Sequence, residues 1–236
     1  AIEFYEQALK ISCEIGDRRG EGAHLGNLGG AYSDLGEPRK AIEFYEQALK
    51  ISCEIGDRRG EEADLGNLGL AYSDLGETTK AIEFYEQALA IAREIADKQN
   101  ESEILCSLGK ANLDLNEVDK TIDNCIKSLD LARSMEYRKF EGEALCTLGK
   151  AFTAQDEPQK ALEHCDQALK IFKDIEYPKG EAEALIARAL ALDQLGQHEE
   201  ATSCAQQALQ IFQRIESPLA EKVRQHLAEW GSHEEK

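Results

Sequence analysis

The sequence predicts an all-α fold, an α-solenoid of tandem helical hairpins. The chain repeats with a fixed period of forty residues, and residues 1–21 are identical to residues 41–61. Within each unit, apolar residues recur at intervals of three and four, which is the spacing of a helix with one buried face. No segment alternates apolar and polar residues for long enough to predict a strand. A fixed period of this size is typical of a solenoid, in which each unit buries its apolar face against its neighbours.

Residues 1–16 predict a helix that matches the second helix of each later unit but has no first helix to pair with it. We expect its small face, formed by Ala1, Tyr5 and Ala8, to be uncovered. The hypothesis is that this end stacks on another molecule or, in a longer protein, on a preceding repeat. Because the chain begins with Ala1 rather than Met, we interpret it as a piece of a longer protein.

Residues 17–216 predict five tandem helix pairs of forty residues each. In the first pair, Leu25 and Leu28 belong to one apolar stripe along the first helix. Gly36 follows this stripe and favours a left-handed cap that ends the helix. Pro38 suits the first turn of the second helix, where its missing amide hydrogen is not needed.

An aspartate is expected to cap the first helix of several pairs through its side chain. These capping residues are Asp17, Asp57 and Asp97. The second helix of the first pair is predicted over residues 38–55, with Ala41, Tyr45 and Ala48 on one face. The same arrangement returns in the later pairs.

Glycine recurs in the middle of the predicted first helices, where it costs up to about 1 kcal/mol relative to alanine. These glycines are Gly29, Gly69, Gly109 and Gly149. Alanine recurs at matching positions of the second helices, such as Ala41 and Ala48. Paired small residues let two antiparallel helices approach to about 8 Å, so we expect tight packing within each pair. The fifth pair departs from the pattern, since Arg188 stands where leucine is expected, and its packing is predicted to be less secure.

Residues 217–230 predict a C-terminal capping helix that begins at Pro218. Leu219, Val223 and Leu227 lie on one side of this helix, and charged residues lie elsewhere. A terminal helix with one apolar and one polar face is what a solenoid needs in order to end. Residues 231–236 are expected to be a disordered tail.

The chain is acidic, with a formal net charge of −19 at pH 7. This charge repels phosphate backbones, so nucleic acid is not an expected partner. An acidic surface favours basic or amphipathic peptides, although it also serves solubility alone. The apolar runs are too short for a spanning helix, and no secretory signal is present. We therefore expect a cytoplasmic protein without a membrane partner.

Most of the seven cysteines recur at the forty-residue period, and no C-x-x-C motif occurs. We expect them to be small buried residues in a reducing compartment rather than disulfides or metal ligands. The five histidines show no metal-ligand or triad spacing, and no P-loop or dinucleotide fingerprint is present. The sequence therefore predicts no catalytic residue, no metal site and no cofactor, and the chain is not expected to be an enzyme.

The apolar and small residues of the first pair resemble the signature of the tetratricopeptide repeat. They are Leu25, Leu28, Gly29, Tyr32, Ala41, Tyr45 and Ala48. The usual unit has 34 residues, and here each has six more. This variant, with its phrase Leu-Gly-Asn-Leu-Gly, is similar to the repeats of kinesin light chain, of the Leu-Gly-Asn polarity adaptors and of sensor arms on bacterial signalling ATPases. The resemblance implies a right-handed superhelix of hairpins, whose first helices line a concave groove for a protein or peptide partner.

Carried over by position, the resemblance implies a set of partner-binding residues on the first helices. They are Asn27, Gly30, Ser33 and Asp34 in the first pair, Asn67, Leu70, Ser73 and Asp74 in the second, Lys110 and Asp114 in the third, and Lys150 in the fourth. One amide per repeat, at Asn27 and Asn67, can donate to and accept from an extended peptide backbone. Alternatively, each amide bonds within its own helix pair. Gly26 and Gly30 stand where a clamp for a terminal carboxylate would need Lys and Asn, which argues against that type of recognition.

Three hypotheses for function follow from these features. The first is a protein-interaction scaffold that binds a peptide or helix in its groove. The second is a ligand-sensing arm of a larger signalling protein, such as a STAND-type ATPase, in which ligand binding changes the superhelix pitch and releases an enzymatic domain. The third is a designed or chimeric repeat protein without a native ligand, because the early copies are nearly verbatim.

Overall fold

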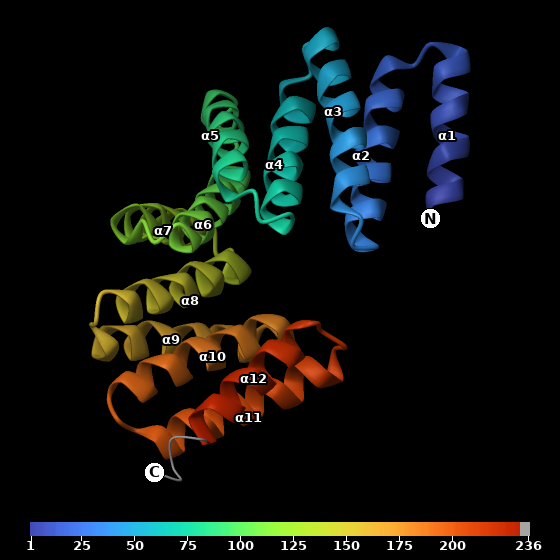
Figure 1. Cartoon of the computed structure of the whole chain (residues 1–236). Helices are drawn as coiled ribbons and strands as arrows, with labels where there is room; N and C mark the ends of the chain where they lie inside the picture. The colour runs from blue at the N-terminus through green and yellow to red at the C-terminus, as the bar shows by residue number, and fades with distance from the viewer. Residues whose placement is uncertain (232–236) are drawn as a thin grey trace. The chain divides into compact units, whose positions relative to one another are not determined.

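The computed structural model describes residues 1–231, and these residues form twelve helices and no strand (Figure 1). The predicted all-α class is therefore confirmed. The chain divides into two compact units, residues 1–115 and residues 116–236. The first contains α1 (Ile2–Ile15), α2 (Arg18–Asp34), α3 (Pro38–Ile55), α4 (Arg58–Asp74), α5 (Thr78–Glu94) and α6 (Lys98–Asp114). The second contains α7 (Val118–Ser134), α8 (Arg138–Ala154), α9 (Pro158–Asp174), α10 (Pro178–Gln194), α11 (His198–Arg214) and α12 (Leu219–Gly231).

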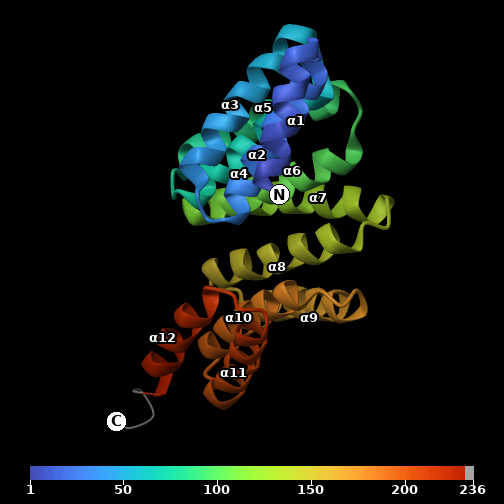
Figure 2. The ribbon, with the colours of Figure 1, turned by 90° about the vertical axis from the view of Figure 1, so that its right-hand side faces the viewer.

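Within each unit, every helix packs against the next helix in sequence order. In the first unit, the first helices of neighbouring pairs also touch, α2 against α4 and α4 against α6. In the second unit, Figure 2 shows α8, α9 and α10 side by side, and α8 contacts α10 directly. This stacking of neighbours in order is the arrangement that a solenoid uses to bury its apolar faces. Of the predicted tail, residues 232–236 lie outside the described residues.

Aspartate side chains cap the first helices of the first unit, as predicted. The backbone N–H of Gly20 donates to Asp17 Oδ1 at 2.9 Å, and that of Gly60 donates to Asp57 Oδ1 at 3.1 Å. Asp97 accepts in the same way from the backbone N–H of Asn100. Each cap satisfies one of the amide groups that the first turn of a helix leaves without a partner.

Residues in the left-handed conformation end most of the helices. Gly36 follows α2 with a φ of 73°, so the predicted left-handed cap is confirmed. Elsewhere in residues 1–231, six residues that carry a Cβ adopt the same conformation, which costs about 1–2 kcal/mol per residue. They are Ala96, Asn116, Glu136, Asp156, Glu176 and Glu216.

The glycines in the middle of the first helices make room for side chains of the second helices. A Cβ at Gly29 would lie 2.6 Å from Cε1 of Tyr45, and a Cβ at Gly69 would lie 2.6 Å from Cδ1 of Tyr85. The expected close approach is present, but the partner of each of these glycines is an aromatic ring rather than a second small residue. At Gly149 the partner is the thiol of Cys165, at 2.4 Å from the position of a Cβ.

The cysteines divide into two groups. None of the seven, all of which are among the described residues, forms a disulfide. Five of them are buried, at positions 106, 125, 146, 165 and 204. The expectation of burial is wrong for Cys13 and Cys53, which are exposed near the ends of α1 and α3. These two follow a buried serine, Ser12 or Ser52, so the helical period turns their side chains away from the core.

Alanine at Gly69 and at Gly66 should change stability in opposite directions. Gly69→Ala drives a methyl group into the Tyr85 ring and is expected to lower the free energy of unfolding by about 1–3 kcal/mol. Gly66→Ala meets no atom within 4 Å and should raise it by up to about 1 kcal/mol, because alanine favours a helix. Urea unfolding followed by circular dichroism measures both. Equal effects of the two substitutions would contradict the ring packing described here.

Candidate functional site

Two neighbouring cavities are lined by the first helices of the first unit. The larger, the Asp64 cavity, has a volume of about 450 Å³ and is lined by residues of α2, α3 and α4. The smaller, the Glu62 cavity, has a volume of about 220 Å³ and is lined by residues of α4, α5 and α6. The polar lining of the Asp64 cavity includes Arg19, Asn27, Ser52, Asp57, Arg59, Asp64 and Asn67. The lining of the Glu62 cavity includes Glu62, Asn67, Leu70, Tyr85, Asn100, Glu103, Ile104 and Ser107.

Three of the predicted partner-binding residues line these cavities. Asn27 and Asn67 both line the Asp64 cavity, and Asn67 also lines the Glu62 cavity beside Leu70. Asn27 is exposed and Asn67 is half-buried. No hydrogen bond joins either side-chain amide to another described residue, in contrast to Asn100 and Asn112, whose amides donate within the protein. The two amides therefore have their donors and acceptors available at the cavity surface.

The other predicted residues line neither cavity. Gly30 lies near the hydroxyl oxygen of Tyr45, which is 3.8 Å from the position that a Cβ would take. The remaining residues in the first unit occupy the C-terminal halves of α2, α4 and α6. They are Ser33, Asp34, Ser73, Asp74, Lys110 and Asp114. Lys150 lies half-buried on α8, in the second unit.

The two carboxylates that name the cavities were not singled out from the sequence. Helices α2 and α4 are near-copies and differ at only three positions. At these positions α4 has Glu62, Asp64 and Leu70, where α2 has Gly22, His24 and Gly30. Each of the three α4 residues lines one of the cavities. A comparison of the two copies in the sequence could have identified Glu62 and Asp64 as candidate site residues.

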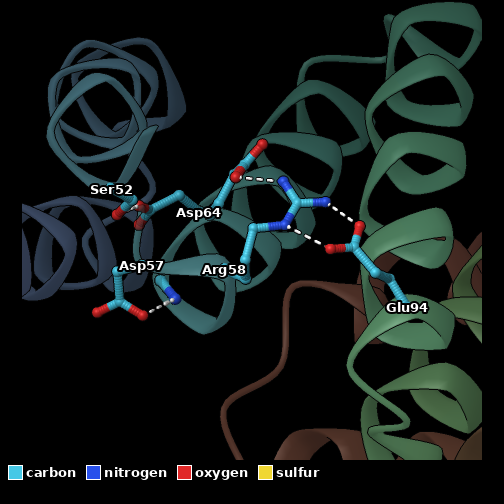
Figure 3. Close-up of polar contacts among 7 residues, drawn as sticks. Ser52, Asp57, Arg58, Asp64 and Glu94 are labelled. Carbon is cyan, nitrogen blue, oxygen red and sulfur yellow. Dashed lines mark hydrogen bonds and ion pairs between the residues drawn. The ribbon is translucent and has the colours of Figure 1, made fainter. Parts of the chain in front are cut away.

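Asp64 is a buried carboxylate, with only 6% of its surface exposed. The hydroxyl of Ser52 donates to its Oδ2 at 2.8 Å, across the contact between α3 and α4 (Figure 3). Burial raises the pKa of Asp64 from 3.8 to about 6, against the opposing effect of the Ser52 hydrogen bond. Near neutral pH the cavity therefore holds a desolvated negative charge on its wall.

Glu62 is buried more deeply, at 3% exposed. The side-chain amide of Asn100 donates to its Oε2 at 2.8 Å, which links α4 to α6. Burial raises the pKa of Glu62, and the hydrogen bond from Asn100 opposes this rise. The phenol of Tyr85 lies in the same cavity, and burial raises its pKa to about 12, so it remains protonated and can donate.

Arginines hold the helix ends that border the cavities. Arg58 spans from the start of α4 to Glu94 at the end of α5, and its Nε donates to Glu94 Oε1 at 3.2 Å (Figure 3). Arg58 also donates to Glu61 on its own helix at 2.5 Å. Arg18 makes the equivalent pair of contacts, with Glu21 and Glu54. Because these pairs are exposed, water screens them and each adds little to stability.

Two further observations concern cofactors and membranes. Among the described residues, no group of three or more His, Cys, Asp or Glu side chains has the geometry to hold a metal ion. None of the helices that the structure describes is long and apolar enough to cross a bilayer.

Comparison with known proteins agrees with this architecture. The family model of the tetratricopeptide repeat matches residues 1–54, 61–134 and 140–214. The structure is similar to that of BtubC (BKLC) from P. vanneervenii, at 18% identity and a TM-score of 0.75, with 91% of each chain covered. It also resembles a putative kinesin light chain of Podosopora anserina with nearly identical TPR-like repeats, at 19% identity and a TM-score of 0.62, over 81% of this chain and 94% of that chain.

A third similar structure belongs to a larger protein. It is a Signal Transduction ATPase with Numerous Domains (STAND) with a tetratricopeptide repeat sensor, from Pyrococcus horikoshii. The two chains are 21% identical with a TM-score of 0.74, and the match covers 98% of this chain and 36% of that chain. No curated protein sequence matches the chain. The resemblance inferred from the sequence is confirmed, and at these identities the structural likeness concerns the fold.

Replacing the buried charge of Asp64 should stabilise the protein at neutral pH. Asp64→Asn keeps an acceptor for the Ser52 hydroxyl and removes the desolvated charge. Because the native pKa is above the unfolded value, the native state holds the proton more tightly, and this group lowers stability as pH rises from about 4 to about 6. The gain from Asp64→Asn should be on the order of 1–3 kcal/mol at pH 7 and should largely disappear at pH 4.

Thermal unfolding at the two pH values measures this difference. Asp34→Asn, which removes an exposed carboxylate of α2, is the control and should change stability little at either pH. A gain from Asp64→Asn that is the same at pH 7 and pH 4 would contradict the assignment of a buried charge.

Proposed function

The chain belongs to the tetratricopeptide repeat family, and on this basis we propose that it is a protein-interaction scaffold that binds a peptide or helix along α2, α4 and α6. Tetratricopeptide repeats generally mediate protein–protein interaction. The observation that carries the proposal for this chain is the pair of amides at Asn27 and Asn67, which have no hydrogen-bond partner among the described residues and which line the same cavity.

The chemistry of these amides suits an extended partner. A side-chain amide both donates and accepts hydrogen bonds, as the peptide backbone does. Each asparagine can therefore bind one peptide group of the partner, whichever side chain the partner has there. Side chains of the partner would then enter the cavities on either side of Asn67, where Leu70 offers apolar contact at 50% exposure. Ser33, Ser73, Asp34 and Asp74 extend the proposed surface along α2 and α4, and Gly30, Lys110 and Asp114 complete it in the first unit. In the second unit, we propose Lys150 of α8 as a separate partner contact.

A partner of this kind requires no catalytic group from the chain, and we assign it none. The seven cysteines form no disulfide, which fits a reducing compartment, and we propose a cytoplasmic protein. A sensor arm of a larger signalling protein is the second candidate function. The observation that favours it is the match of nearly this whole chain to the STAND structure with a repeat sensor.

The proposal is tested by removing the two amides. Peptides selected from a random phage-displayed library on the wild-type protein serve as probes, and their affinities are measured by fluorescence anisotropy. The double variant Asn27→Ala/Asn67→Ala should bind about tenfold more weakly or worse, because each lost hydrogen bond contributes about 1 kcal/mol.

The matched control removes two other amides that are forty residues apart. Gln47 and Gln87 are exposed on the second helices, and each donates to a carbonyl of its own helix. Gln47→Ala/Gln87→Ala should leave the affinities unchanged. If every selected peptide binds the asparagine variant as tightly as wild type, the amides do not hold the partner backbone and the proposal fails.

We also propose that α1 takes part in self-association. Phe4 of α1 is 71% exposed, whereas Phe44 and Phe84 at the same repeat position stack on Tyr32 and Tyr72 with ring centroids 5.3 and 5.2 Å apart. Ile11 and Ile15 extend this exposed apolar face of α1. A surface of this kind favours contact with another helix.

Sedimentation velocity over a range of concentrations measures this association. Wild type should form dimers or larger species at high concentration, and Phe4→Glu should shift it to monomer. The control Ile126→Glu, at an exposed isoleucine of α7, should leave the association intact. A wild-type protein that stays monomeric throughout would rule out self-stacking through α1.

A further inference from the structure

Glu62 is unusual among the repeats of this chain. The positions that match it in the other units carry Gly22, Ser102, Gly142 and Ala182, all of them small. Only in α4 does this position hold a long, ionisable side chain, and that side chain is 97% buried, since its exposed fraction is 3%. A buried carboxylate lowers stability unless it is paired and hydrogen-bonded.

The contacts of Glu62 inside the protein do not require a charged side chain at this position. A carboxylate accepts hydrogen bonds at two oxygens, and the structure supplies one such bond to Glu62, from the amide of Asn100. A glutamine could accept the same bond through its carbonyl oxygen without any desolvated charge. Arg59 acts electrostatically on Glu62, but its own side chain is exposed and lines the other cavity.

The Glu62 cavity has the surfaces that a long cationic side chain needs. Glu62 and Glu103 contribute two carboxylates to its lining, and no lysine or arginine is among the described residues that line it. Leu70 and Ile104 provide apolar contact for a methylene stem. The cavity volume of about 220 Å³ is that of a site for one side chain rather than for a folded segment.

The neighbouring Asp64 cavity lacks this imbalance of charge. Arg19 and Arg59 line it together with Asp57 and Asp64, and Arg19 pairs with Asp57 at 3.3 Å. Two positive and two negative groups thus face one another there. The described lining of the Glu62 cavity differs in composition, since it includes two carboxylates and no arginine.

We propose that the Glu62 cavity binds a lysine or arginine side chain of the partner, with Glu62 and Glu103 as its anionic ligands. This inference rests on the proposed function, because it names the side chain that the partner inserts beside Asn67. The guanidinium or ammonium group replaces lost hydration of Glu62 with a charge-assisted hydrogen bond. The net charge of −19 assists by attracting basic partners to the chain as a whole.

The test uses single capped amino acids, which carry the side chain without an extended backbone. Acetyl-arginine amide, acetyl-lysine amide and the neutral isostere acetyl-citrulline amide are titrated into ¹⁵N-labelled protein. The side-chain amide signals of Asn67 and Asn100 report occupancy of the cavity by NMR. The two cationic probes should bind about tenfold more tightly than citrulline, as expected for a charge-assisted hydrogen bond to a partly desolvated carboxylate.

Two variants separate binding from structure. Glu62→Gln keeps the bond from Asn100, so its thermal midpoint should equal or exceed that of wild type, while its affinity for the cationic probes should fall toward that for citrulline. Glu103→Gln should weaken the same probes with no effect on citrulline. Glu86→Gln removes an exposed glutamate of α5 outside both cavities and is the matched control.

The inference fails if arginine and citrulline bind equally, if neither cationic probe binds, or if Glu62→Gln binds them as wild type does. Its failure differs from that of the proposed function. Asn27 lines only the Asp64 cavity, so Asn27→Ala should spare the capped amino acids while it weakens the selected peptides. Peptide binding without a preference for cations would overturn this inference alone, and cation binding without any effect of the asparagines on peptides would overturn the proposed function alone.

Discussion

The packing of a tyrosine ring over a glycine of the preceding helix is the contact on which the hairpins of the first unit depend. The ring of Tyr85 lies against the backbone at Gly69, and that of Tyr45 lies against Gly29. A side chain at either glycine would push the helices apart. The same contact brings Tyr85 into the lining of the Glu62 cavity, so the residue that closes the hairpin also forms one wall of the candidate site. The helix packing and the candidate site therefore both require that position 69 has no side chain.

Much of the fold could be predicted from the sequence, because a forty-residue period repeats the same local signals. The apolar stripes, the aspartate caps and the glycine that ends α2 all act within a few residues, where sequence spacing determines which groups meet. Contacts between helices are harder to predict from the sequence. Arg188, at a leucine position, donates to Asp166 at 2.8 Å and to the Cys204 thiol at 2.9 Å, and so keeps its charge paired. The pairing of Arg188 depends on residues of two neighbouring helices, so the apolar periodicity of its own helix does not predict it.

The candidate site shows the same division. Asn27, Asn67 and Leu70 were chosen by their position within the repeat and line the cavities, whereas the other eight predicted residues do not. Position within the repeat did not identify Glu62 and Asp64, because charged residues are mostly exposed in proteins and nothing in the helical period marks these two as buried. Burial of a side chain in a stack is decided by the neighbouring helices as well as by its own. The differences between α2 and α4 were visible in the sequence, but only the packing of the helices shows that the differing residues of α4 line the cavities.

A solenoid can hold two such carboxylates because its stability is a sum of local terms. Each helix pair interacts mainly with its neighbours, so a destabilising charge lowers the stability of one interface and leaves distant ones unchanged. In the second unit the positions that match Glu62 and Asp64 are glycine or alanine, at 142, 144, 182 and 184, and a continuous apolar core extends from Cys125 to Val223. In α4, Ser52 and Asn100 each donate to one oxygen of a buried carboxylate. The buried carboxylate of α8, Glu141, instead pairs with Arg133 and Arg138. Two buried carboxylates on the first helix of one repeat are what we expect where local stability is lowered in favour of the binding proposed above.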